Sequence, residues 1–493
     1  MSTLPDAKLF IDGKLCDATG GGTYDVISPW TGEVAGKAAD GTEADVNAAI
    51  AAARRAFDET DWSTNHDKRL ALVKKLRELF EKNRKRLGEL ATHEAGAAQG
   101  AVNRAHVDMA LDGWDDYLAV FPRVTWEKDY GNKFGFGFES HRVAHYEPIG
   151  VVGAITPWNV PLYVNIGKVV AALLAGCTVI LKPAPDTPGM GSIFGELAQE
   201  AGFPPGTLQV VFGQDPALAG ELLVKDPRVD LISFTGSTGI GKRIMEQGAA
   251  TLKRVFLELG GKSAKIVLED APNFAMDCAT TMLVFHAGQG CAVQSRLLVP
   301  KSRYEEAKAI LKQSYAGLGD NWGVIDHPDH IMGPVVSKRQ MDRVMSYIEL
   351  GQKEGATLLC GGKTRPDKGG GFFIEPTCFV DVTNDMRIAQ EEIFGPVLVV
   401  IPFEDDEDAI RIANANSYGL SGGVSSADFD RAMRVAKRIR TGSMSVNGGM
   451  CIAGDIPFGG YKASGIGREW GVEGIEEYLE TKMIAWPVTP VAA

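Results

Sequence analysis

The sequence predicts an α/β protein whose first large unit is a doubly wound parallel sheet. From Gly150 onward, short apolar runs alternate with longer segments of helical spacing. The apolar runs cover residues 151–155, 178–181, 208–212, 231–234 and 255–257, and the helical segments cover 161–175, 189–201, 216–224 and 238–249. This rhythm predicts right-handed crossovers between parallel strands, as in dinucleotide-binding domains, with ligands bound beyond the carboxyl ends of the strands.

The segment ahead of this sheet has the pattern of packing helices. Apolar residues recur at intervals of three and four between residues 46 and 80. Thr42, followed by Asp45 three residues later, is typical of a helix start. We assign these helices to the same unit as the sheet, so the dinucleotide-binding domain is expected to comprise residues 1–125 and 149–259.

A second α/β pattern follows and predicts a further domain over residues 260–477. Its strand candidates are the apolar runs 264–268, 296–299, 379–382 and 397–403. Between residues 130 and 146, alternating phenylalanines and few helix formers predict a β-hairpin arm. With the C-terminal end of the chain, this small β arm is expected to take up residues 126–148 and 478–493.

Composition and charge exclude several classes of partner. The 493 residues are 45% hydrophobic, which is enough for large cores, and the formal net charge of -12 gives no general attraction to nucleic acid. The longest apolar run, residues 169–181, is shorter than the about 20 residues that span a bilayer. The first residues lack an apolar stretch of signal-peptide length. We therefore expect a cytoplasmic protein with no membrane partner.

The seven cysteines point to a reduced compartment and to no metal site. Their number is odd, no two form a CxxC pair, and no histidine cluster lies near them. A single cysteine is most often a small buried hydrophobe. Cys291 differs, because it follows Gly288-Gln289-Gly290 and lies 33 residues after Glu258, which precedes two glycines. This combination suggests a covalent enzyme in which a thiolate attacks and a carboxylate activates water.

Together with Pro157-Trp158-Asn159 and Phe234-Thr235-Gly236-Ser237, these two residues resemble motifs of the aldehyde dehydrogenase superfamily. The resemblance extends over roughly residues 10–482. It implies oxidation of a small-molecule aldehyde to a carboxylic acid, with reduction of NAD(P), through a cysteine thiohemiacetal and thioester. It also implies that the arm serves oligomerisation, as a homodimer or homotetramer.

The resemblance gives four residues catalytic roles. Cys291 attacks the aldehyde, and Glu258 deprotonates the water that hydrolyses the thioester. Asn159 forms an oxyanion hole with the Cys291 N–H, although an asparagine before Pro161 is also a common helix cap. Glu469 matches a position proposed for proton relay, and a solvated helix glutamate is the alternative. Glu258 also favours water over coenzyme A as the acyl acceptor, so a CoA-acylating enzyme is a minor alternative.

The resemblance also implies a cofactor site at the ends of the first set of strands. The Gly236-to-Gly241 turn is expected to face the pyrophosphate, Lys182 the adenosine ribose, and Glu392 and Phe394 the nicotinamide end. The residues assigned to cofactor contact are Ile155, Trp158, Lys182, Gly236, Ser237, Gly241, Leu259, Glu392 and Phe394. Pro185 stands where the family often has a ribose-binding glutamate, so NAD is preferred and NADP stays open.

Substrate contacts are expected on the helix that follows Asn159. The residues assigned to the substrate tunnel are Val160, Tyr163, Val164, Gly167, Ile452 and Phe458. Gly167 stands where many relatives carry a bulky aromatic residue, which predicts a wide tunnel and an apolar or aromatic aldehyde. The alternative from another class is a non-catalytic structural or binding protein of the same fold. The combination of Cys291, Glu258 and Asn159 argues against it.

Overall fold

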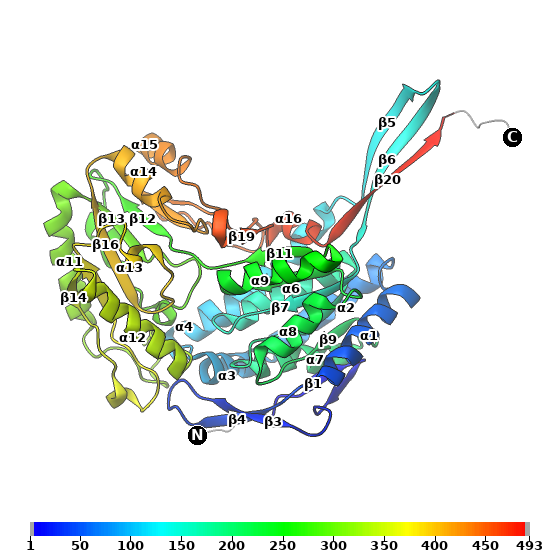
Figure 1. The fold of residues 1–493 in the computed structure, drawn as a ribbon, viewed down its shortest axis with the longest axis horizontal. Coiled ribbons are helices and arrows are strands. Elements are labelled where there is room, and N and C mark those ends of the chain that lie inside the picture. The colour runs from blue at the N-terminus through cyan, green and yellow to red at the C-terminus, as the bar shows by residue number, and fades with distance from the viewer. Residues whose placement is uncertain (1–3, 489–493) are drawn as a thin grey trace.

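The computed structural model describes residues 4–488, and its first large unit is an eight-stranded sheet (Figure 1). The sheet order is β19 (Gly465–Ile466), β11 (Arg254–Glu258), β10 (Leu231–Thr235), β7 (Val151–Ile155), β8 (Thr178–Lys182), β9 (Leu208–Val210), β1 (Leu9–Ile11) and β2 (Lys14–Cys16). Strands β7 to β11 are mutually parallel, whereas β1, β2 and β19 join as antiparallel edges. The predicted doubly wound sheet is confirmed.

The order of the parallel strands creates a topological switch point. Strand β7 pairs with β8 on one side and with β10 on the other. The chain therefore builds outward from β7 through β8 and β9, and then crosses to the other side for β10 and β11. In open α/β sheets, ligands bind beyond the carboxyl ends of the strands that flank such a point. These ends are at Ile155 and Thr235.

Helices cover both faces of this sheet, and alternate residues of the strands divide between them. Val151 packs in a core with α1 (Glu43–Glu59), α8 (Pro216–Lys225) and α9 (Thr238–Gly248). Val152 packs in the opposite core with α2 (His66–Lys82), α5 (Met109–Val120), α6 (Pro161–Ala175) and α7 (Pro188–Ala201). All residues of β7 and β8 are buried, as expected for parallel strands covered on both sides.

The N-terminal helices begin as the sequence predicts. The Thr42 hydroxyl accepts a hydrogen bond from the backbone N–H of Asp45, whose carboxylate accepts the Thr42 N–H in return. The remaining elements of this region are β3 (Thr23–Ile27), β4 (Val34–Ala39), α3 (Arg84–Ala95), α4 (Gln99–Ala101), the π-helical turn Val102–Asp108, and the 3-10 turns Phe121–Arg123 and Ala249–Thr251. Strands β3 and β4 form a separate antiparallel pair.

The second unit is a seven-stranded sheet. Its order is β14 (Thr357–Cys360), β15 (Thr377–Val380), β16 (Val397–Phe403), β13 (Arg296–Pro300), β12 (Ala264–Val267), β17 (Gly422–Ser425) and β18 (Ser445–Val446). Only the edge strand β14 is antiparallel to its neighbour. One face packs on α12 (Lys338–Lys353), α14 (Asp406–Asn414) and α15 (Phe429–Ala436), and the other on α10 (Phe274–Ala279) and α11 (Tyr304–Leu318).

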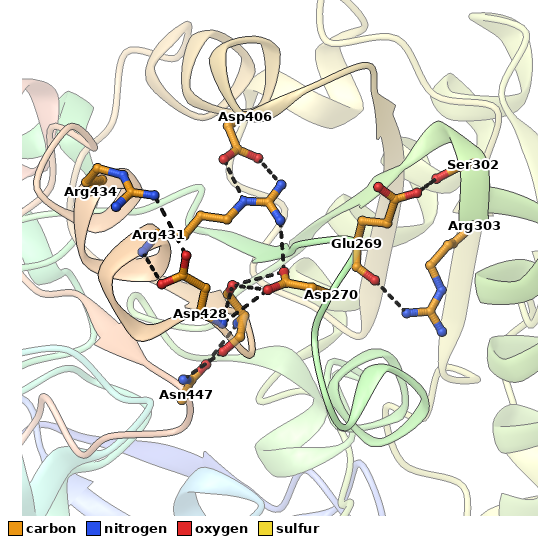
Figure 2. Close-up of polar contacts among 10 residues, drawn as sticks. Glu269, Asp270, Ser302, Arg303, Asp406, Asp428, Arg431, Arg434 and Asn447 are labelled. Atoms are coloured by element: carbon orange, nitrogen blue, oxygen red, sulfur yellow. Dashed lines mark hydrogen bonds and ion pairs between the residues drawn. The ribbon is translucent and has the colours of Figure 1, made fainter.

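An ion-pair network holds α15 at one end of this second unit. The Arg431 guanidinium binds both carboxylate oxygens of Asp406, at the start of α14, and also Asp270, in the loop after β12 (Figure 2). The Asp270 carboxylate in turn accepts the Ser426 hydroxyl. Bidentate pairing of this kind fixes geometry as well as charge. The network thus joins α14 and α15 to the loop after β12.

The third unit is an antiparallel arm that projects from the body of the molecule (Figure 1). It contains β5 (Glu127–Gly135), β6 (Phe138–Pro148) and β20 (Leu479–Pro487), with β6 in the centre. The predicted hairpin is present, and the end of the expected arm, residues 489–493, lies outside the described residues, as do residues 1–3. Among residues 4–488, no helix is long and apolar enough to cross a membrane.

The chain segment before β20 pairs with the first sheet through β19. The remaining elements are α13 (Arg387–Gln390), α16 (Gly471–Glu476) and the 3-10 turns Phe285–Gly288, Lys301–Arg303, Pro366–Lys368 and Lys462–Ser464. Strand β19 lies within the 260–477 range assigned to the second domain, yet it pairs with β11 at Glu258. This pairing brings residues 458–470 to the end of β11.

Candidate active site

Glu258 and Cys291 are brought together between the two large sheets. Glu258 is the last residue of β11, and Cys291 lies on the loop between the Phe285–Gly288 turn and β13. Burial and, to a smaller extent, the nearby carboxylates of Glu258 and Glu392 together raise the pKa of the Cys291 thiol to about 12. The thiol is therefore protonated at neutral pH. Its attack on a carbonyl requires that the proton be removed.

Glu258 is a buried carboxyl group with a second carboxylate close by. Its side chain is 2% exposed, and neither oxygen has a hydrogen-bond partner among the described residues. Burial, followed by repulsion from Glu469, raises its pKa well above the usual range, while Lys168 and Arg468 act in the opposite direction. A carboxyl group in this environment holds its proton to higher pH than a solvated one, and it acts as a base only in its ionised form.

Glu469 is part of a buried ion pair. Its Oε1 accepts a hydrogen bond of 2.9 Å from Lys168 Nζ, and both side chains are almost completely buried. Lys168 lies on α6 and also donates to the Ser233 hydroxyl of β10. The alternative of a solvated helix glutamate is therefore wrong. Lys168 was not predicted, because a lysine in a helical segment gives no sequence signal of its own.

Asn159 contacts the loop that carries Cys291. Its Nδ2 donates a hydrogen bond of 3.1 Å to the carbonyl oxygen of Gln289, two residues before Cys291. Asn159 is 4% exposed, and the N-cap of α6 is Val160, which makes no side-chain capping bond. The helix-cap alternative for Asn159 is therefore wrong.

Gln289 fixes this loop through its own side chain. Its Nε2 donates to the carbonyl oxygens of His286 and Pro334, and its Oε1 accepts the backbone N–H of Val336 at 2.9 Å. The side chain is 1% exposed, so these bonds are not shared with solvent. Gln289 thus ties the Cys291 loop to the segment before α12. It stands inside the quoted motif, but its role was not predicted.

Two glycines after Glu258 permit the close approach of Cys291 and Glu392. The Gly261 N–H donates to Glu392 Oε1 at 2.8 Å. A Cβ atom on Gly261 would lie 2.3 Å from the Cys291 carbonyl oxygen, and one on Gly260 would lie 2.3 Å from Glu392 Oε2. The obstacle at Gly261 is backbone, whereas at Gly260 it is the end of the Glu392 side chain, which would have to move. The two glycines therefore set the distance between the nucleophile loop and Glu392.

A cavity of about 410 Å³ lies at the switch point of the first sheet. Of the nine residues assigned to the cofactor, Ile155, Trp158, Lys182, Gly236 and Ser237 line it. The hydroxyl groups of Thr156 and Thr235, which also line it, are buried without a partner among the described residues. An elongated ligand rich in hydroxyl and phosphate oxygens fits this donor set. The residues present therefore fit a dinucleotide.

The other assigned cofactor residues lie around this cavity. Gly241 packs against Leu259, because a Cβ on Gly241 would come within 2.6 Å of that side chain. The Phe394 ring meets the Trp158 ring edge-on, with centroids 5.3 Å apart. Burial raises the pKa of Glu392 to about 7. Phe394 and Glu392 thus lie between the cavity and Cys291.

Lys182 and Asp186 lie close to each other in the lining of the cavity. Burial lowers the pKa of Lys182 to about 8, and the carboxylates of Asp186 and Asp215 oppose this shift. Asp186 lines the cavity one position after Pro185, whose carbonyl oxygen accepts the Tyr24 hydroxyl. The carboxylate of Asp186 is therefore present at the cavity, although the preceding residue, Pro185, has no carboxylate.

The expected substrate residues divide between a core and a second cavity. Val160 and Ile452 pack with Cys291 against an apolar cluster that includes Tyr163 and Phe458. Ile452 also lines a cavity of about 430 Å³, together with Met282, Leu283, Phe285, Ala292, Met450 and Cys451. Val164 is buried outside that cluster. Polar residues, among them Lys265, Thr280 and Gln294, complete the lining of this second cavity, so the space next to Ala292 has a mixed character.

Gly167 does not widen this space, which corrects the expectation from the sequence. A Cβ on Gly167 would lie 3.2 Å from both the Trp470 ring and the Glu469 carboxyl carbon. The Trp470 ring stacks on the Tyr117 ring, with centroids 4.7 Å apart, and packs at a tilt against the Tyr163 ring, with centroids 4.5 Å apart. The space that a bulky residue at 167 would fill is therefore occupied by an indole from another segment.

Comparison with known proteins gives the same family over the whole chain. Residues 16–484 match the sequence profile of the aldehyde dehydrogenase family. A 3-succinoylsemialdehyde-pyridine dehydrogenase from a Pseudomonas species is 41% identical over 482 residues, covering 97% of this chain and 98% of that protein.

Two solved structures have the same fold throughout. An aldehyde dehydrogenase from Mycobacterium tuberculosis, complexed with NAD+, is 39% identical with a TM-score of 0.94 and covers 100% of both chains. A mutant of aldehyde dehydrogenase C from Pseudomonas syringae, complexed with NAD+ and octanal, is 36% identical with a TM-score of 0.91, covering 97% of this chain and 96% of that chain.

Proposed function

The chain belongs to the aldehyde dehydrogenase family, and we propose that it oxidises an apolar aldehyde to the carboxylic acid with Cys291 as nucleophile. NAD is the cofactor of this NAD-dependent aldehyde dehydrogenase, and when bound it accepts the hydride that leaves the substrate carbon. The observation that supports the proposal is that Cys291, Glu258 and Asn159 lie close together, with the dinucleotide cavity and a second, partly apolar cavity lined by neighbouring residues.

In the first half of the reaction, Cys291 forms a bond to the aldehyde carbon. Once its proton is removed, the thiolate attacks the carbonyl, and the carbonyl oxygen becomes an oxyanion. The Asn159 amide, held at the Gln289 carbonyl, and the backbone N–H of Cys291 are the donors for that oxyanion. Loss of one such donor typically lowers the rate by about 10²–10³-fold, so both are expected to matter kinetically.

In the second half, Glu258 activates water. After hydride loss the acyl group is a thioester on Cys291, and Glu258 in its ionised form takes a proton from the attacking water. Cys291 then leaves as a thiolate. The buried pair of Glu469 and Lys168 lies beside Glu258 and provides the neighbouring site for the proton that Glu258 must pass on.

The substrate class follows from the cavity on the Cys291 side. Its lining includes apolar Phe285, Met450 and Ile452 beside polar residues, and the Phe285 and Met450 side chains are exposed to solvent, at 40% and 81%. The relative from Pseudomonas syringae was solved with octanal, an unbranched apolar aldehyde. We infer that this enzyme also accepts aldehydes with an aliphatic or aromatic body. Gly167 no longer supports a preference for bulky ones.

A panel of aldehydes tests the activity. With NAD present, hexanal, octanal and benzaldehyde should each produce reduced nicotinamide, measured by its absorbance, whereas succinic semialdehyde should be a poor substrate. Cys291→Ala should abolish turnover and keep NAD binding, because the cofactor cavity does not depend on the thiol. Appreciable turnover by this variant would remove Cys291 from the mechanism.

The same assay separates the alternatives. A non-catalytic protein of this fold would turn over none of the aldehydes, yet Cys291, Glu258 and Asn159 are all present and in contact range of one loop. A CoA-acylating enzyme would require coenzyme A for turnover and would release a CoA thioester. Glu258 supports water as the acceptor, because a carboxylate close to Cys291 can activate water for attack on the thioester.

The cofactor preference is proposed to be NAD over NADP. Asp186 lines the cavity near Lys182, and a carboxylate there repels the 2′-phosphate of NADP while it can accept ribose hydroxyls. Measurement of kcat/KM with both cofactors decides this point.

The arm supports a homodimer or homotetramer as the assembled state. Its strands leave large apolar side chains in solvent, among them Phe134 at 71%, Phe136 at 103% and Trp486 at 46% exposed. Apolar groups gathered on a projecting arm are typical of an interface. Light scattering after size-exclusion chromatography gives the number of subunits. The cytoplasm is the proposed location, since all seven cysteines are free thiols.

A further inference from the structure

Two cysteines outside the active site lie directly opposite each other on neighbouring strands. Cys360 ends the edge strand β14 and pairs with Cys378 of β15 in the antiparallel register. Opposed residues in such a pair have Cα atoms about 4.5–5.5 Å apart, which is within the about 4.4–6.8 Å that a disulfide spans. Both side chains belong to the apolar cluster on the α11 face of the sheet. The two sulfur atoms therefore point to the same side.

A β-bulge in β14 brings Cys360 opposite Cys378. The register shifts between Leu358 and Cys360, so that one extra residue of β14 bulges out before the pair. Without the shift, Leu359 would face Cys378. Phe379, the next residue of β15, packs on the other face of the sheet, which confirms that Cys378 alone points toward α11 at this position.

The two thiols differ in access and in acidity. Cys360 is partly exposed, whereas Cys378 is 0% exposed. The Cys378 S–H interacts with the Cys360 sulfur, which lowers the pKa of Cys360 and raises that of Cys378. Cys360 thus has the character of an attacking thiol and Cys378 that of a resolving thiol. Neither residue has a part in the proposed oxidation of aldehydes.

We propose that Cys360 and Cys378 form a reversible disulfide, a redox modification site separate from the catalytic thiol. With a hydroperoxide as oxidant, the Cys360 thiolate attacks one peroxide oxygen, the O–O bond breaks, and hydroxide or an alkoxide leaves. Cys360 is then a sulfenic acid. The Cys378 sulfur attacks the Cys360 sulfur, the S–O bond breaks, water leaves, and the disulfide forms. The two thiols lose two electrons, which reduce the peroxide.

Disulfide formation protects Cys360 from further oxidation to sulfinic acid. A sulfenic acid without a neighbouring thiol is open to further oxidation to sulfinic acid, which thiol reductants do not reverse. Cys378 traps the sulfenic acid first, and a dithiol reductant then restores both thiols. The cross-link also closes the loop of residues 361–377, which contains the 3-10 turn Pro366–Lys368.

Tryptic peptide mapping tests the proposal directly. Lys353, Lys363, Lys368 and Arg387 place the two cysteines on separate tryptic peptides, residues 354–363 and 369–387. Folded full-length protein with Cys291→Ala, which removes the catalytic thiol as a competing target, is treated with hydrogen peroxide, alkylated and digested without reductant. We expect the two peptides to appear as one linked species, two hydrogens lighter than their sum, that dithiothreitol separates.

Matched variants complete the experiment. Cys360→Ser should abolish the linked species, whereas Cys16→Ser, which removes another partly exposed cysteine, should leave it unchanged. If Cys360→Ser fails to fold, the parent protein still decides by its alkylation pattern. Full alkylation of Cys378 after peroxide treatment, with Cys360 either free or present only as its sulfenic or sulfinic acid, would overturn the proposal.

Discussion

A single methyl group at Gly261 tests how closely the nucleophile loop must approach the end of β11. A Cβ atom on Gly261 would lie 2.3 Å from the Cys291 carbonyl oxygen, more than 1 Å inside the 3.4 Å at which ordinary contact begins. The obstacle is backbone, so no side-chain rotation relieves the overlap. In Gly261→Ala, either Gly261 or the Cys291 peptide must therefore move by about 1 Å.

This displacement acts on the catalytic geometry more than on the fold. A misplacement of about 1 Å at a reacting group costs on the order of 10²-fold in rate. Overpacking costs about 1–3 kcal/mol of stability, which a chain of 493 residues with several large cores tolerates. We therefore expect kcat/KM for octanal to fall about 100-fold in a protein that is folded and still binds NAD.

The assay combines steady-state formation of reduced nicotinamide with alkylation of Cys291 by iodoacetamide. Gly317→Ala is the matched control, because a Cβ there meets no atom within 4 Å, and its activity should equal that of the parent. Turnover of Gly261→Ala within two-fold of the parent would refute the reasoning. It would mean that the Cys291 loop moves away without loss of reactive geometry.

Three further predictions concern the base and the tunnel. Glu258→Gln should give a burst of reduced nicotinamide followed by slow turnover, because an amide takes no proton from water, and unchanged turnover would exclude Glu258 as the base. In the parent, deacylation should speed up as pH rises above the usual carboxyl range, since burial and Glu469 raise the pKa of Glu258 and only its ionised form is active. Gly167→Trp should lower the thermal midpoint and impair short and long aldehydes alike, because Trp470 fills that space, and Gly167→Trp with Trp470→Leu should recover stability. Selective loss of long aldehydes in the single variant would show instead that Gly167 borders the substrate.

Much of the fold was predictable because its signals are local. Fully buried parallel strands such as β7 and β8 are continuous apolar runs, and the helices between them have helical spacing. The edge strands were not predictable in the same way. Strand β19 has two residues, and its pairing with β11 depends on a contact between segments about 200 residues apart. Periodicity contains no information on such pairings.

The same distinction between local motifs and long-range contacts applies to the residues of the candidate site. Cys291, Glu258 and Asn159 stand in recognisable motifs, so the resemblance could assign them. The roles of Lys168 and Gly261 depend on what lies opposite them in space, and neither residue type is unusual for its segment. Gly167 shows the error that results. A missing side chain was interpreted as open space, whereas the Trp470 ring from another segment fills it.

The charge state of the site assigns Glu258 to the second half of the proposed reaction. Burial is the largest cause that raises the pKa of both the Cys291 thiol and the Glu258 carboxyl, so each group holds its proton to higher pH than it would in water. In its protonated form the Glu258 carboxyl cannot take the proton of the thiol, so we expect formation of the thiolate not to depend on Glu258. Activation of water does require it, and only after Glu258 has lost its own proton. The first half-reaction should therefore survive in Glu258→Gln, and the burst should keep an amplitude close to one equivalent per active site.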